Sequence, residues 1–82
     1  SYITIVKVGT EYHAYNEFDQ DGIIIRSFAT GKFIKLPPKG DIVLSPGDEI
    51  YFGLVNNKAA KITCGGKLYK YIRIARFVED RR

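Results

Sequence analysis

One stretch, residues 39–78, most constrains the fold of this chain. It reads KGDIVLSPGDEIYFGLVNNKAAKITCGGKLYKYIRIARFV, four runs of β-branched and aromatic residues separated by three turn signals. The turn signals are residues 45–48 (SPGD), 56–57 (NN) and 65–66 (GG), which are combinations typical of hairpin turns. The runs between them fit a pleated, half-buried surface. The stretch therefore predicts an antiparallel meander of four strands that fills half of the protein.

The turn lengths decide which side chains of this meander share a face, because strand side chains alternate with a period of two. Two-residue loops would set Lys61 opposite Lys70 on the apolar face, which is unfavourable. Three-residue loops, with Asn57 and Gly66 in the left-handed conformation, separate apolar from polar side chains far better. We therefore expect three-residue loops, which set Ile62 opposite both Ile50 and Leu68.

In this register the two faces differ sharply in character. The predicted core face holds Ile50, Phe52, Leu54, Ala60, Ile62, Leu68, Ile72 and Ile74. The predicted outward face holds Tyr51, Gly53, Ala59, Lys61, Thr63, Tyr69, Tyr71 and Arg73.

The first half of the chain also consists of short β-type runs. We expect strands over 2–8, 11–18, 22–28 and 32–36, with a hairpin tip at 19–22 (DQDG). Residues 37–40 (PPKG) cannot join a ladder, so we place them between two sheets or at a corner. No helical period of useful length is present. The prediction is an all-β fold, a small antiparallel β-sandwich or partly open β-barrel of about eight short strands, in one domain spanning 1–82 with the meander at 39–78.

Composition sets broad limits on class and location. The 82 residues are 45% hydrophobic, enough for one core. The single Cys64 excludes an internal disulfide and favours a reducing compartment. No run approaches the roughly 18 apolar residues of a membrane span, and no signal peptide is visible. We expect a cytoplasmic or virion-associated protein that is not embedded in a membrane.

Charge is unevenly distributed along the chain. Lys and Arg number 13 against 9 Asp and Glu, for a net charge of +4. Acidic residues gather in 11–21 and 41–49, whereas basic residues gather in 58–76. This polarity favours anionic partners, electrostatic steering or head-to-tail self-association.

No residue pattern supports catalysis, a metal site or a cofactor. His13 and Cys64 are each the single residue of their kind, and no motif pairs a base with a nucleophile. The DQDG segment at 19–22 resembles the start of a calcium loop but lacks the later acidic ligands. Gly65-Gly66-Lys67 lacks the helix start that a phosphate cradle needs. We therefore predict a non-enzyme without metal or cofactor.

The outward face of the predicted meander is the remaining candidate site. A protein interface there would use Tyr51, Lys61, Tyr69, Tyr71 and Arg73, because Tyr and Arg are enriched at binding hot spots. Tyrosines that stack bases beside cations that meet phosphates would also suit single-stranded nucleic acid. That alternative would use Lys61, Lys67, Tyr69, Lys70, Tyr71 and Arg73.

The two binding hypotheses lead to one expected function and one alternative. The expected function is non-enzymatic protein binding or self-assembly, as an accessory, regulatory or virion-type structural subunit. A small β-barrel that binds single-stranded nucleic acid is the alternative, and an ordinary solvated sheet face is the simplest reading of the same residues.

A short segment resembles one known family. Residues 44–53 (LSPGDEIYFG) resemble the paired strands of forkhead-associated domains, which often carry a similar Gly-Asp-x-Ile step. The resemblance covers ten residues, and the phosphopeptide-reading Arg, Ser and Asn-Gly motifs of that family are not recognisable in this chain. We assign no family on this basis.

Overall fold

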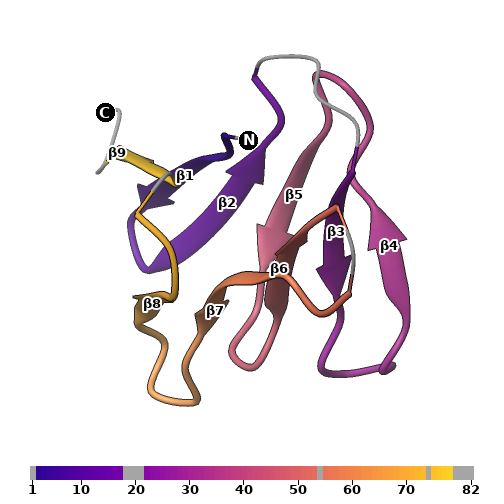
Figure 1. Ribbon diagram of the computed structural model, residues 1–82. Coiled ribbons are helices and arrows are strands. Elements are labelled where there is room, and N and C mark those ends of the chain that lie inside the picture. Colours follow the sequence, from indigo (N-terminus) through magenta and orange to yellow (C-terminus); the bar gives the residue numbers. More distant parts are fainter. Residues whose placement is uncertain (1, 18–21, 54, 74, 79–82) are drawn as a thin grey trace.

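The computed structural model describes residues 2–17, 22–53, 55–73 and 75–78, and these residues form nine short strands (Figure 1). None of the described residues is helical. The strands are β1 (Thr4–Val8), β2 (Glu11–Tyr15), β3 (Ile23–Arg26), β4 (Phe33–Lys35), β5 (Asp41–Leu44), β6 (Glu49–Phe52), β7 (Lys58–Ile62), β8 (Leu68–Lys70) and β9 (Arg76–Val78).

The strands belong to two sheets that pack as a sandwich, not as a closed barrel. One sheet has the order β5-β2-β1-β9 and the other β4-β3-β6-β7-β8. The pairings are antiparallel except for β9, which runs parallel to β1. Figure 1 shows β9 beside β1 at one side of the molecule and β4 at the opposite side. The predicted all-β class is confirmed.

The predicted four-stranded meander is wrong at both of its ends. β5 pairs with β2 in the four-stranded sheet, and β9 pairs with β1, so that β6-β7-β8 alone form a continuous meander. Residues 45–48 are therefore a corner between the sheets and not a hairpin. Residues 37–40 lie between β4 and β5, which belong to different sheets, as expected.

Asp48 holds the corner at 45–48 in place. Its two carboxylate oxygens accept hydrogen bonds from the main-chain N–H groups of Ser45 and Phe28, both at 2.9 Å. Gly47 has φ +91°, a conformation that glycine adopts without steric cost. The Phe28 N–H belongs to the β3–β4 connection, so Asp48 joins the corner to a distant part of the chain.

The predicted register holds for one of the two hairpins. Ile62 lies opposite Leu68 and Lys61 opposite Tyr69, and Gly66 has φ +79°, all as expected. Between β6 and β7 the register is different, because Ile50 lies opposite Ala60 instead of Ile62. There Gly53, at φ +74°, takes the left-handed conformation that we expected of Asn57.

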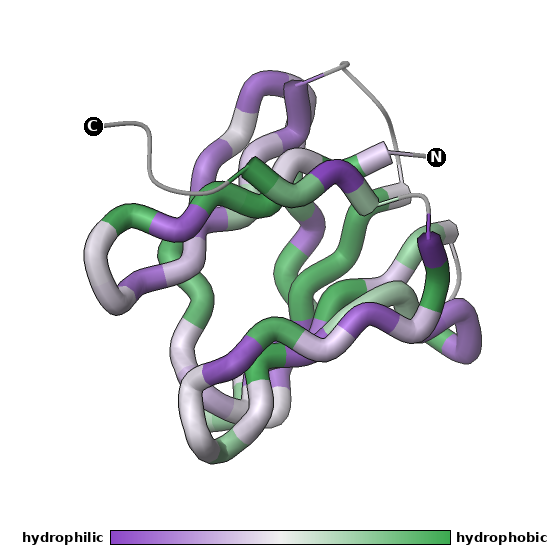
Figure 2. Tube along the Cα trace, turned by 90° about the vertical axis from the view of Figure 1, so that its left-hand side faces the viewer, coloured by the Kyte–Doolittle hydropathy of each residue, from purple (hydrophilic) through white to green (hydrophobic). Residues whose placement is uncertain are grey.

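The core lies between the two sheets. Ile3, Ile5, Ile23, Ile25 and Ile50 are among its fully buried side chains. Figure 2 shows hydrophobic stretches on segments of both layers that border the interior.

The predicted core face is confirmed for most of the residues that the structure describes. Ile50, Phe52, Ala60 and Ile62 are buried, and the partly buried Leu68 and Ile72 pack against the core. Leu54 and Ile74, which belong to the same predicted face, lie outside the described residues. Ala59 and Tyr51, predicted to face outward and be exposed, are buried.

Candidate functional site

The candidate site is the outer face of the five-stranded sheet, which is the face turned away from the core. Because directly opposed residues of antiparallel strands share a face, the register defines two rows across all or most of the five strands. One row is Phe33, Arg26, Glu49, Lys61 and Tyr69. The neighbouring row is Lys35, Ile24, Tyr51 and Lys58.

Glu49 lies at the centre of this face and forms ion pairs with two basic residues of the neighbouring strands, Lys58 and Arg26. The Lys58 Nζ lies 2.7 Å and an Arg26 guanidinium nitrogen 3.5 Å from its carboxylate oxygens. The Tyr51 hydroxyl donates a hydrogen bond of 2.8 Å to the same carboxylate. Burial by itself raises the pKa of Glu49, but the hydrogen bonds from Lys58 and Tyr51 and the nearby positive charges outweigh it, so that the pKa lies below its ordinary value.

Tyr51 is on the outer face but is not exposed on it. Only 6% of the residue is accessible, and the Phe33 ring meets its ring edge-on with centroids 6.0 Å apart. Burial, together with the hydrogen bond to Glu49, raises the pKa of its phenol. The expectation of an exposed Tyr51 is therefore wrong, because Tyr51 is buried in contact with the Phe33 ring of β4 and the Glu49 carboxylate.

Tyr69 and Tyr71 remain open to a partner. They are 53% and 44% exposed, and their rings form an edge-to-face pair with centroids 4.9 Å apart. The Lys58 ammonium lies 5.4 Å from the centre of the Tyr71 ring, a cation–π distance. Lys58 therefore links the exposed tyrosine pair to the network around Glu49.

The other predicted site residues do not all lie on the outer face. Lys61 is half-buried between Glu49 and Tyr69 on the outer face. Lys67 and Arg73 are exposed beyond the two ends of β8. Lys70 lies opposite Ala60, on the other face, and its ammonium is 5.9 Å from the Phe77 ring of β9. The outer face thus brings together Lys61, Tyr69 and Tyr71, whose binding role stays a prediction.

Sequence reasoning missed the part of this face that β3 and β4 contribute. Arg26 and Phe33 join it because β3 pairs with β6, a contact between residues far apart in the chain. The Arg26 guanidinium lies 5.7 Å from the centre of the Phe33 ring, and Phe33 is half exposed. Nothing in the local sequence around Arg26 or Phe33 predicts that the two residues lie on the same face as Glu49.

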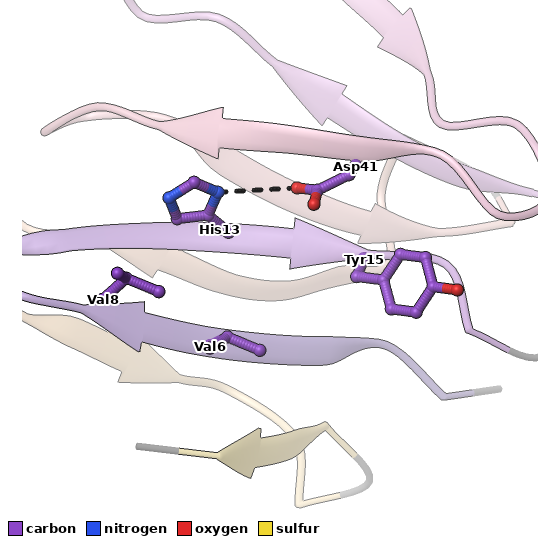
Figure 3. Close-up of a pocket in the computed structure, with 5 residues that line it drawn as sticks. All are labelled: Val6, Val8, His13, Tyr15 and Asp41. Atoms are coloured by element: carbon purple, nitrogen blue, oxygen red, sulfur yellow. Dashed lines mark ion pairs between the residues drawn. The ribbon is translucent and has the colours of Figure 1, made fainter. Parts of the chain in front are cut away.

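The four-stranded sheet carries a separate cavity. A cavity of about 340 Å³ is lined by Val6, Val8, His13, Tyr15 and Asp41 (Figure 3). His13 lies 3.5 Å from Asp41 and 3.7 Å from Glu11. The cavity lining offers no thiol or serine hydroxyl as a nucleophile. Across the described residues, no group of three His, Cys, Asp or Glu side chains could hold a metal ion.

The structure bears on three further features of the sequence. Cys64 is an exposed, free thiol in the β7–β8 turn. The DQDG segment, considered as a calcium-loop start, lies mostly outside the described residues. In the part of the chain that the structure describes, no helix is long and apolar enough to cross a membrane.

Comparisons of the chain with protein-family models, with curated proteins and with solved structures find no match.

Proposed function

We propose that this protein is a non-enzymatic binding domain that contacts a protein partner through the outer face of its five-stranded sheet. The observation that carries the proposal is the exposed pair of Tyr69, on β8, and Tyr71, which directly follows β8, beside a network of ion pairs. Tyrosine supplies large contact area at a small loss of conformational freedom, and such anchors dominate many interfaces. A domain of this kind serves as an accessory, regulatory or structural subunit, in the cytoplasm or in a virion.

The network around Glu49 supports an interface that is formed before binding. Lys58 contacts both Glu49 and the Tyr71 ring, and Tyr71 in turn packs against Tyr69, so these contacts restrain the tyrosine pair before a partner binds.

The test compares binding by the wild type with binding by Tyr69→Ala and Tyr71→Ala. Partners are captured from the native source with nuclease present, and the affinity of a purified partner is then measured by calorimetry. We expect each alanine to weaken binding by about 2 kcal/mol or more while the domain stays folded. Val43→Ala, an exposed position on the other sheet, is the control. Unchanged affinity in both tyrosine variants would contradict the proposal.

Single-stranded nucleic acid is the second candidate, and the charge of the outer face favours it. Arg26, Lys35, Lys58 and Lys61 lie on that face with Glu49 as its one acid among the residues of the two rows. Binding through phosphates releases counterions, so affinity for an oligothymidine would fall steeply between about 50 and 200 mM salt. Absence of micromolar binding at the low-salt end would exclude this candidate.

A further inference from the structure

Strand β4 is an open edge of the five-stranded sheet. It pairs with β3 on one side, and no other strand of the described residues pairs with it on the other side. Figure 1 shows it at the outer limit of the sheet, beyond β3. All three of its residues are exposed. An edge of this kind can accept a further strand from another polypeptide.

The hydrogen-bonding pattern directs main-chain groups of β4 outward. The Ser27 N–H donates to the Lys32 carbonyl and the Leu36 N–H to the Ile23 carbonyl, at 2.9 and 2.8 Å. In an antiparallel ladder, hydrogen-bonded and non-hydrogen-bonded pairs alternate. The Arg26–Phe33 pair, next to Ser27–Lys32, is therefore of the second kind. The N–H and C=O of Phe33 consequently point away from β3, toward the open edge.

Exposed apolar side chains surround this edge. Phe28 is 70%, Phe33 50% and Ile34 42% exposed, and they lie within one short segment of the chain. Phe33 stands on the outer face, whereas Ile34, opposite the buried Ile25, stands on the core side. A strand added here would cover apolar surface on both sides of the sheet.

Charge decides which kind of strand fits. Lys32 and Lys35 flank the edge on its two faces, and Arg26 lies on the adjoining strand. Lysines on an edge repel a second basic edge, so pairing of two copies through β4 would bring like charges together. The same lysines attract carboxylates. We propose that the open edge of β4 binds an extended, acidic segment of a protein partner, which adds a sixth strand to the five-stranded sheet.

This inference rests on the proposed function and names the chemistry of the partner. The added strand would hydrogen-bond to Phe33 through its main chain. Its carboxylates would lie beside Lys32 or Lys35, and its apolar side chains beside Phe33 or Ile34. The outer face then continues from the Tyr69–Tyr71 pair at β8 to the added strand beyond β4.

The probe for the test is a short fluorescein-labelled peptide of alternating glutamate and valine. We expect anisotropy to report binding that a lysine–valine peptide does not show. N-methylation of the acidic peptide, which blocks its main-chain N–H groups, should abolish binding. Lys35→Glu should weaken binding about tenfold or more, whereas Lys7→Glu, the same charge change on the other sheet, should change it less than about twofold.

Amide exchange locates the peptide without relying on a variant. In the wild type, bound peptide should slow exchange at the Phe33 amide more than at amides of β8. Protection at β8 instead, or equal binding of the N-methylated peptide, would overturn the inference. Sedimentation that shows a dimer disrupted by Lys35→Glu would also overturn it in favour of a second copy.

Failure here is distinguishable from failure of the proposed function. If the acidic peptide does not bind but Tyr69→Ala still weakens the native partner, only the β4 assignment is wrong. If the peptide binds at Phe33 while both tyrosine variants keep full affinity for the native partner, the proposed function through the tyrosine pair is wrong and the β4 assignment stands. An oligothymidine that displaces the peptide from Phe33 would show that the edge binds anions without selecting a strand, and would overturn the inference.

Discussion

The Lys58 ammonium lies 2.7 Å from the Glu49 carboxylate, although Lys58 stands opposite Tyr51 in the strand register. The register shifts between Ile50 and Tyr51, so that Ala59 is an extra residue of β7 with no direct partner on β6. This bulge lets Lys58 and Lys61 both reach the outer face while Ala59 and Ala60 are both buried. Bulges re-aim side chains in this way next to functional surfaces.

Replacement of Glu49 should change how stability depends on pH. Because the folded-state pKa of Glu49 is below its ordinary value of 4.5, its carboxylate stabilises the fold above that value. The contribution is lost as pH falls through the depressed pKa. Glu49→Gln should therefore unfold more easily near neutral pH and lose less stability than the wild type below about pH 5. Urea unfolding over a pH series measures this, with the exposed Glu11→Gln as control, and parallel pH curves for wild type and Glu49→Gln would contradict it.

Alanine at Tyr51 should be far more costly to folding than alanine at Tyr69. Tyr51 is buried and hydrogen-bonded, so truncation should lower the free energy of unfolding by about 3–5 kcal/mol. Tyr69 is half exposed, and its truncation should cost less than about 1 kcal/mol. Denaturant titrations of the two variants measure the difference. Equal losses would mean that the outer face is not organised as described.

Asp48→Ala should loosen the corner between β5 and β6. Removal of the carboxylate leaves the N–H groups of Ser45 and Phe28 without their acceptors, at a cost of about 2–4 kcal/mol in the free energy of unfolding. Asp41→Ala, at an exposed carboxylate, should have a small effect. Thermal melts compare the two variants, and faster amide exchange at Phe28 in Asp48→Ala would locate the change.

Two glycines with positive φ should respond differently to alanine. A Cβ at Gly47 would lie 2.5 Å from Cγ of Phe28, whereas a Cβ at Gly31 would meet nothing within 4 Å. Gly31→Ala therefore carries only the conformational penalty, about 1–2 kcal/mol. Gly47→Ala adds overlap with Phe28 and should cost at least about 1 kcal/mol more. Chemical unfolding of both variants decides this, and equal costs would show that Phe28 moves aside freely.

The class of fold could be predicted because its signals are local. Alternating runs and turn residues indicated short strands, and GG at 65–66 correctly set Ile62 opposite Leu68. The neighbouring hairpin escaped prediction because the bulge at Ala59 depends on burial of both alanines and on the ion pair of Glu49 with Lys58. Those are contacts across strands, which loop length alone does not specify.

The sequence predicted only part of the candidate site. Tyr69, Tyr71 and Lys61 belong to one hairpin, so strand alternation was enough to place them on one face. Arg26 and Phe33 were missed because β3 joins this sheet through a long-range pairing with β6. Tyr51 was expected to be exposed, since alternation shows which face a side chain is on but not what covers it.

The sequence by itself determined that this chain forms short strands, where most of them turn, and which side chains of the β7–β8 hairpin face outward. Only the tertiary structure decided that β5 and β9 leave the meander, that Tyr51 is buried, and that β4 ends a sheet whose other edge carries the tyrosines. The physical reason is that turn and alternation preferences act within a few residues. The choice of partner strand depends instead on burying the apolar faces of both sheets together.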